Sequence, residues 1–221
     1  MFDVFTPRMW QLLWQATGET LYMVFASGAV ATLLGIPLGV ALFVTRKGQI
    51  KENIFWNNIL GTIINIGRSV PFVILLVAII PFTMMLIGTF IGTTAAIVPL
   101  SIAAIPFVAR LIENSLMEIP SGLSEAAKAM GATNFQIITK FLLPEAMGSI
   151  VNAITITLVT LVNYSAMAGT VGGGGLGYVG IQYGYQTYMP AVLLATVVIL
   201  VVMVQIIQMV GDYCVHRLDH K

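Results

Sequence analysis

Residues 125–131 read Glu-Ala-Ala-Lys-Ala-Met-Gly, and nine residues later positions 141–144 read Phe-Leu-Leu-Pro. The first of these runs has the signals of a short amphipathic helix. Ser121 is placed to be its N-cap, and the carboxylate of Glu125 falls within about the first turn, where it suits the positive end of the helix dipole. Gly131 follows the apolar positions as a residue that readily adopts positive φ, so the helix is predicted to end there.

A second short helix is predicted directly after this glycine. Thr133 and Gln136 have the Thr-x-x-Gln spacing of a capping box. Pro144 is expected to stop the helix. Before it, apolar residues recur at helical spacing: Phe135, Ile138, Phe141 and Leu142. The stretch from about 117 to 144 is therefore a helix-turn-helix hairpin. Each helix has about nine residues, too few to be stable alone in water, so the hairpin needs a surface on which to dock.

The hairpin is flanked by long apolar runs, and its spacing resembles the EAA loop of importer-type ABC permeases. That signature is Glu-Ala-Ala, three residues, Gly, nine residues and Ile-x-Leu-Pro, and this chain departs from it at Phe141, where the family often has Ile. In that family the loop is a coupling helix that sits in a groove of the cytoplasmic ATPase subunit. The resemblance assigns coupling to five residues: Glu125, Ala126, Ala127, Gly131 and Pro144. The alternative is a generic pair of capped interfacial helices.

The composition indicates a membrane protein with several spans. It is 58% hydrophobic and 9% charged, whereas about a quarter of the residues in soluble domains are charged. The net charge of +1 indicates no particular partner, and no nucleic-acid partner is expected. A single cysteine, Cys214, excludes an intrachain disulfide. The first apolar run, 20–45, is too long for a signal peptide and is interpreted as an uncleaved span. Within it, Gly35-x-x-x-Gly39 is either a close-packing face or ordinary lipid-embedded helix.

Two long uncharged stretches set the number of spans. As helix, residues 69–109 would measure about 60 Å and residues 146–211 about 100 Å, against a bilayer core of about 30 Å. Each must fold back once, the first at residues 88–94 and the second at the glycine run 172–177. The prediction is an all-α integral membrane protein with five transmembrane helices, at about 20–44, 57–81, 94–113, 149–168 and 190–211.

The positive-inside rule orients these spans. In the five-span arrangement only Arg8 lies clearly on one side, and the loops of that side carry no basic residue. The other side carries Arg46, Lys47, Lys51, Arg110, Lys128, Lys140, Arg217 and Lys221. The N-terminus is therefore predicted outside, and the hairpin and the C-terminus are predicted in the cytoplasm. A surface segment, 1–16, then precedes the transmembrane domain, 17–211, and a cytoplasmic tail, 212–221, follows it.

Polar residues within the spans are candidates for a translocation pathway. Thr160, Asn163 and Met167 are spaced by three and four and therefore share one face of the fourth span. Polar side chains at membrane depth usually face protein or a cavity. The alternative for this face is helix packing stabilised by hydrogen bonds between helices. Arg68 either lies within the second span and faces the bundle interior, or snorkels to the cytoplasmic interface.

The chain lacks the residues for chemistry of its own. It has no phosphate-binding loop of the type Gly-x-x-x-x-Gly-Lys-[Ser/Thr] and no spaced pair of intramembrane carboxylates. The glycines at 172, 174 and 177 fit Gly-x-Gly-x-x-Gly, but no βαβ context surrounds them, so we reject a nucleotide site. Four possible metal ligands are interpreted as a solvated tail: Cys214, His216, Asp219 and His220. No catalytic residue, metal or cofactor is assigned to the chain.

Further stretches resemble the permease subunit of the bacterial methionine ABC importer. They are residues 44–50, 68–72, 106–114 and 164–177. The resemblance implies a homodimeric type I ABC importer permease in the bacterial cytoplasmic (inner) membrane, moving methionine by alternating access. Its partners would be a dimer of cytoplasmic ATPases, which binds ATP and Mg, and an extracytoplasmic methionine-binding protein. The alternatives are a permease for another amino acid or small solute, and an ATP-independent channel or secondary transporter.

Overall fold

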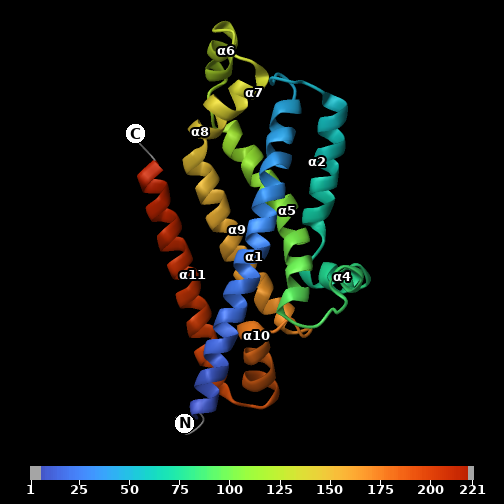
Figure 1. The fold of residues 1–221 in the computed structure, drawn as a ribbon, viewed down its shortest axis with the longest axis vertical. Coiled ribbons are helices and arrows are strands. Elements are labelled where there is room, and N and C mark those ends of the chain that lie inside the picture. The colour runs from blue at the N-terminus through green and yellow to red at the C-terminus, as the bar shows by residue number, and fades with distance from the viewer. Residues whose placement is uncertain (1–5, 219–221) are drawn as a thin grey trace.

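Figure 1 shows an elongated bundle of helices in the computed structural model, which describes residues 6–218. Four long helices run along the long axis: α1 (Pro7–Thr45), α5 (Thr93–Met117), α9 (Met147–Gly169) and α11 (Pro190–Leu218). A fifth helix, α2 (Ile54–Ser69), packs beside α1 and α5. The described residues contain no strand, so the predicted all-α class is confirmed.

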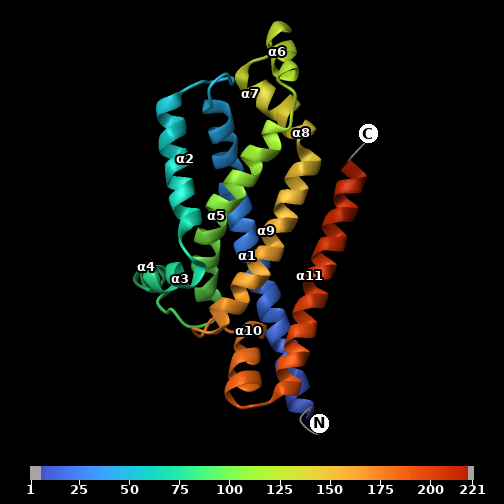
Figure 2. The same ribbon diagram turned by 180° about the vertical axis from the view of Figure 1, so that it is seen from behind.

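Short elements lie at the two ends of the bundle, as Figures 1 and 2 show. One end carries α6 (Ser121–Ala129), α7 (Asn134–Gln136), the π-helix η1 (Ile137–Leu142) and α8 (Leu143–Glu145). The opposite end carries α10 (Gly175–Val179) and the π-helix η2 (Gly180–Gln186). The N-terminus lies near α10, whereas the turn between α1 and α2 and the C-terminal end of α11 lie toward the α6 end.

The second apolar segment is broken. Four described helices are long and apolar enough to cross a membrane, or five if α2 and α3 (Phe72–Ala78) form one bent span. The sequence predicted one straight span over 57–81, but the chain bends by 99° between α2 and α3. The bend falls at Pro71, which disfavours helical geometry at Val70, where φ is −82° and ψ is 124°. After it, α4 (Ile80–Ile87) runs across the long axis (Figure 1).

The first helix is longer than the predicted span. It begins at Pro7, a position where the missing N–H of proline costs nothing, and Thr6 caps it by accepting a hydrogen bond from the Met9 N–H at 3.3 Å. The 39 residues of α1 measure about 58 Å, roughly twice a bilayer core. The described part of segment 1–16 is therefore continuous, in one helix, with the predicted first span.

The C-terminal tail also continues a helix in its described part. α11 extends seven residues past the predicted end of the fifth span, through residues 212–218. The remaining tail residues, Asp219, His220 and Lys221, lie outside the described residues.

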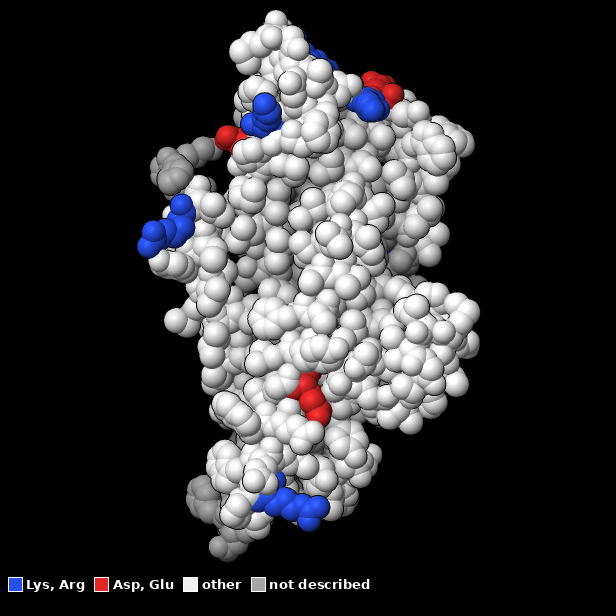
Figure 3. Space-filling model, in the orientation of Figure 1, with Lys and Arg blue, Asp and Glu red and all other residues white. Residues whose placement is uncertain are grey.

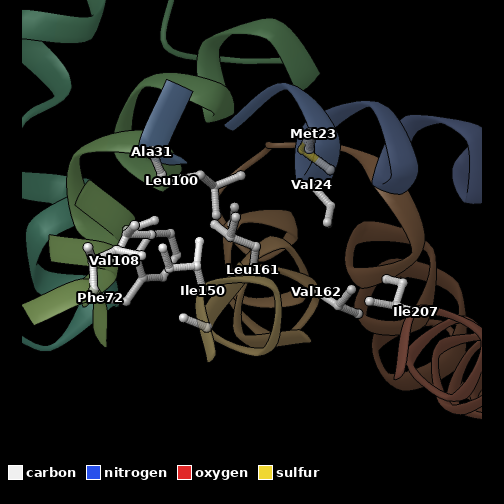
Figure 4. Packing of buried hydrophobic residues seen from close by; sticks show 14 of the residues in the cluster. Met23, Val24, Ala31, Phe72, Leu100, Val108, Ile150, Leu161, Val162 and Ile207 are labelled. Atoms are coloured by element: carbon white, nitrogen blue, oxygen red, sulfur yellow. The ribbon is translucent and has the colours of Figure 1, made fainter. Parts of the chain in front are cut away.

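Glycines allow α1 to pack closely on α5. A Cβ added at Gly35 would lie 2.6 Å from the Val108 side chain, and a Cβ at Gly39 would lie 2.5 Å from the backbone oxygen of Ala109. Gly35-x-x-x-Gly39 is therefore a close-packing face, the first of the two interpretations. Figure 4 shows part of the hydrophobic core formed by these helices and α9, including Met23, Ala31, Leu100, Val108 and Leu161.

Glycines also form the turns at the α10 end. Gly88 and Gly92 have φ of 85° and 102°, and Gly172 and Gly174 have φ of 88° and 79°. Non-glycine residues rarely adopt such values. Both predicted reversal points therefore contain glycine turns, although the first segment also bends at Pro71, and α10 and η2 lie between the second turn and α11.

The start of α10 is capped by side chains of α1. The N–H of Gly175 donates to Glu19 Oε2 at 2.8 Å, and the N–H of Leu176 donates to Thr20 Oγ1 at 2.9 Å. The backbone amides at the end of the glycine run are thus already hydrogen-bonded within the protein. A carboxylate at this position also suits the positive end of the helix dipole.

Candidate functional site

The hairpin, residues 121–142, stands out at one end of the bundle (Figure 1). Its first helix, α6, starts at Ser121, and no side chain caps this start. The prediction of Ser121 as N-cap is therefore wrong: Pro120 occupies the cap position with an extended ψ of 135°. Glu125 is the fifth residue of α6, just past the first turn, so the dipole stabilises its carboxylate less than predicted.

The end of α6 matches the prediction. Gly131 has φ of 82°. Its N–H bonds to the carbonyl of Lys128 at 2.9 Å, and the N–H of Ala132 bonds to the carbonyl of Ala127 at 3.0 Å. This pair of bonds is a Schellman motif. A Cβ at Gly131 would meet nothing within 4 Å, so the backbone conformation alone requires glycine here.

The second half of the hairpin begins as predicted and continues differently. Thr133 Oγ1 accepts from the Gln136 N–H at 3.3 Å, and Gln136 Oε1 accepts from the Thr133 N–H at 2.9 Å, which confirms the capping box. Pro144, however, does not stop the helix, because α8 and α9 follow with only Ala146 between them. A proline ring clashes with the carbonyl four residues earlier in an α-helix. The wider π-helical turn of η1 directly before it accommodates this ring.

The hairpin buries some of its apolar side chains and exposes others. Ala127, Ile137 and Leu142 are buried, and α6 and α7 pack mainly on η1 within the hairpin. Met130 is 71% exposed and Phe135 is 73% exposed. The exposed residues predicted for coupling are Glu125, Ala126, Gly131 and Pro144. The two adjacent alanines therefore have different roles, since Ala126 is available to a partner and Ala127 is not.

A polar cluster missed by the sequence reasoning lies where the spans meet the hairpin. Glu113 on α5 is 4% exposed, and its Oε2 lies 2.5 Å from Arg110 Nη1. Arg110 Nη2 donates to Asn65 Oδ1 on α2 at 2.7 Å. The cap residue of α1, Arg46, lies with its Nη1 4.0 Å from Glu113 Oε1. The Arg-x-x-Glu spacing at the end of an apolar run was the available signal, because i and i+3 side chains are neighbours on a helix.

The polar face predicted on the fourth span is one face of α9. Asn163 and Met167 are exposed and Thr160 is partly exposed, so this chain does not cover that face. Thr160 Oγ1 donates to the Ile156 carbonyl within the same helix at 2.8 Å. None of the hydrogen bonds recorded for residues 6–218 joins this face to another helix through these three side chains. Within one chain, the structure therefore does not support the alternative that this face packs on another helix through hydrogen bonds of these side chains.

Arg68 lies apart from the other pathway candidates. It sits in the last turn of α2, one residue before the end of the helix, and it is exposed. Its guanidinium has no ion pair or hydrogen bond among residues 6–218. The chain just after it does reach α9, because the ring of Phe72 stacks on Tyr164 with centroids 4.6 Å apart. The start of α3 therefore contacts α9 through Phe72, whereas Arg68 makes no hydrogen bond or ion pair with α9.

Several apolar helices of membrane-spanning length, packed through glycines and carrying an exposed hairpin at one end, define a multi-pass membrane protein. The model of the family described as "Binding-protein-dependent transport system inner membrane component" matches residues 31–221. The chain belongs to this family and is a multi-pass transport subunit of the inner membrane.

Two relatives within this family are similar to nearly the whole chain. The probable D-methionine transport system permease protein of Vibrio cholerae is 63% identical over 210 residues, which cover 95% of this chain and 93% of the relative. The corresponding protein of Pasteurella multocida is 55% identical, with 98% of this chain and 100% of the relative covered. Both similarities include the hairpin and the spans on either side of it.

Solved structures show the same fold. A chain of the methionine ABC transporter in an inward-facing conformation is 52% identical, with a TM-score of 0.97 and coverage of 98% of this chain and 100% of that one. An amino acid ABC transporter solved with histidines is 19% identical, with a TM-score of 0.77 and coverage of 94% of both chains. The second likeness concerns the fold alone.

Proposed function

We propose that this chain forms half of the translocation pathway of an ATP-driven importer, which carries methionine across the inner membrane by alternating access. Relatives named for D-methionine transport and the solved methionine transporter support this substrate, because each matches nearly the whole chain at more than half identity. The exposed hairpin is the observation that carries the mechanism.

The hairpin has the properties of a docking element for an ATPase. Met130 and Phe135 are exposed although they lie beyond the apolar spans, and exposed apolar groups of this kind mark protein interfaces. Ala126 permits close approach of a partner, and the turn at Gly131 sets the angle between the two short helices. In this proposal ATP and Mg are bound by the partner ATPase dimer, whose closure pushes two docked hairpins together.

The topology proposed for the chain has five spans, with the N-terminus outside and the C-terminus in the cytoplasm. Basic residues of the α1–α2 turn, the hairpin and the end of α11 all lie toward the α6 end. On the face shown in Figure 3, most charged side chains lie toward that end, and a broad uncharged band separates them from the few charges toward the N-terminus. This distribution supports a cytoplasmic hairpin.

A second copy of the chain is the proposed partner across the pathway. One chain supplies one hairpin for two ATPases, and closed two-fold symmetry is the commonest way to supply the other. The uncovered face of α9 with Thr160, Asn163 and Met167 would then line the space between the copies. Arg68, which has no ion pair or hydrogen bond with any residue from 6 to 218, would face that space as well. An extracytoplasmic methionine-binding protein would deliver substrate near α10 and the N-terminus.

Uptake of labelled methionine tests the proposal. The chain is placed in proteoliposomes with its ATPase and binding protein, with and without ATP, and with competing amino acids. We expect uptake that requires ATP and is blocked chiefly by L- or D-methionine. ATP-dependent uptake that is blocked chiefly by another solute would support an ATP-driven permease but would show that its substrate is not methionine. Uptake that is indifferent to ATP would show a channel or a secondary transporter instead.

A further inference from the structure

The polar cluster at the base of the hairpin has no role in the function proposed so far. It consists of Arg46, Asn65, Arg110 and Glu113, and we call it the basal cluster. Glu113 is the one charged residue among the buried residues that the structure describes in 6–218. A buried carboxylate is costly unless it is paired and hydrogen-bonded, so its retention there requires the surrounding partners.

Arg110 joins α5 to α2 while it pairs with Glu113 on its own helix. One nitrogen of its guanidinium contacts Glu113 on α5 at 2.5 Å, and another donates to Asn65 on α2 at 2.7 Å. The planar, forked guanidinium fixes both partners at once, which an ammonium group would not do as well. α2 and α5 are therefore held at a defined spacing at this level.

The same end of α1 is tied into this unit. Arg46 extends from the end of α1 toward Glu113, and Asn57 of α2 donates through Nδ2 to the carbonyl of Leu42 at 2.7 Å and to Thr45 Oγ1 at 3.1 Å. The first of these bonds uses a backbone carbonyl in the last turn of α1, and the second uses a side-chain hydroxyl. The ends of α1, α2 and α5 near the hairpin are thus connected by polar contacts.

The hairpin itself touches this unit at few points. A cavity of about 320 Å³ separates the α1–α2 turn from α6 and is lined by Arg46, Gln49, Ser121 and Ser124, among others. Arg46 crosses toward Met117, the last residue of α5, and contacts its Sδ. Only three residues separate Met117 from the start of α6. A displacement of the hairpin therefore enters the spans through the end of α5 on one side and through α8 and α9 on the other.

We propose that Glu113 is a positioning residue that makes α1, α2 and α5 move as one body when the hairpin is displaced. The proposal rests on the proposed function, in which an ATPase moves the hairpin. With Glu113 and its partners in place, movement of α5 carries α2 through Arg110 and Asn65, and α1 through Arg46. Without the carboxylate, α5 moves while the other two helices lag, and ATP is hydrolysed without substrate crossing.

The test compares transport with ATP hydrolysis in the complete complex. Glu113→Gln keeps the size of the side chain and removes its charge. We expect methionine imported per ATP hydrolysed to fall about tenfold, within the usual range of coupling between sites. Glu118→Gln is the matched control, because Glu118 is an exposed acid five residues further on that accepts a hydrogen bond from Ser149 Oγ at 2.7 Å. That variant should keep the unmodified ratio.

A second variant keeps the test decisive if Glu113→Gln does not assemble. Asn65 is exposed, so Asn65→Ala should fold, and it removes only the acceptor for Arg110. We expect a smaller fall in the same ratio. A purely structural role would lower the amount of assembled complex and leave the ratio per complex unchanged. An unchanged ratio in either assembled variant, or an equal fall in Glu118→Gln, would overturn the proposal. Failure of the proposed function itself would be seen first, as ATP-independent uptake by the unmodified chain.

Discussion

α6 and α10 are short helices at opposite ends of the bundle, and the structure holds them in opposite ways. The first N–H groups of α10 bond to Glu19 and Thr20, which belong to α1 and lie more than 150 residues away in the chain. α6 has no side-chain cap at its start and buries only Ala127. The difference shows that α10 is hydrogen-bonded into the bundle, whereas most of α6 is left exposed.

Glycine serves different purposes in the two regions. At Gly177 in α10, a Cβ would lie 2.3 Å from the backbone oxygen of Ala166 on α9, so space requires glycine. At Gly131 after α6, there is open space, and only the positive φ requires glycine. Substitutions should therefore destabilise the fold in the first region and impair function with the fold intact in the second.

The largest effect is expected from Gly177→Ala. The added methyl collides with backbone, which cannot move aside as a side chain would, and we expect a loss of about 3 kcal/mol or more of stability. Thermal unfolding of the purified protein in detergent measures it. Gly18→Ala is the control, because a Cβ there meets nothing within 4 Å. Equal unfolding temperatures of the two variants would contradict the close contact between α9 and α10.

The next largest effect is expected from Gly131→Val, which should impair transport. A β-branched residue at φ of 82° is strained by about 1–3 kcal/mol and would unwind the turn between the two hairpin helices. We expect ATP-dependent uptake to be abolished while membrane insertion changes little. Gly131→Asn, which tolerates positive φ, should keep most of the uptake. Normal uptake by the valine variant would show that the angle of this turn is not needed for coupling.

Glu19→Ala should destabilise the structure less, and only at the end of the bundle that carries α10. It removes the acceptor of the Gly175 N–H, a loss of about 1–2 kcal/mol by analogy with N-cap substitutions. Hydrogen exchange of the amides of α10 should accelerate about tenfold, as about 1.4 kcal/mol corresponds to a factor of ten. Gln15→Ala is the control, since Gln15 bonds to Glu19 and not to α10. Unchanged exchange in Glu19→Ala would show that α10 does not depend on α1.

The smallest effect is expected from Thr133→Ala. It removes the side-chain half of the capping box at the start of α7, at a cost of about 0.5–1 kcal/mol. Exchange of the amides just after it should accelerate a few-fold, and uptake should change little. Thr139→Ala is the comparison, because that hydroxyl only donates to the Phe135 carbonyl at 2.8 Å. A larger increase in exchange for Thr139→Ala than for Thr133→Ala would show that the hydroxyl in the π-helix, and not the capping box, stabilises this segment.

Local chemistry explains which parts of the hairpin were predictable. Gly131 and the pair Thr133 and Gln136 act through backbone groups a few residues away, so their roles follow from spacing alone. Ser121 failed as a cap because Pro120 already sets the chain direction before the helix. Pro144 failed as a stop because η1 widens the turn before it. Each error arose where two adjacent signals competed.

The bend at Pro71 and the basal cluster are two features that the sequence pattern did not reveal. Hydropathy detected an apolar segment over 57–81, and it does not distinguish a straight span from one bent by 99°. Glu113 was visible as an acid near the end of a span, but Arg110, which pairs with it, donates to Asn65 on α2, 45 positions earlier in the chain. Contacts between residues so far apart leave no periodic pattern in the sequence.

The sequence by itself determined the class, the number of apolar segments and the location of the hairpin, because these depend on hydropathy, charge and short-range capping. Tertiary structure decided that α1 caps α10, that Glu113 is buried between two arginines, and that Ala127 is buried while Ala126 is exposed. It also decided that the polar face of α9 stays uncovered within one chain. These features depend on which helices pack together, and packing is the sum of many weak contacts between residues far apart in the chain.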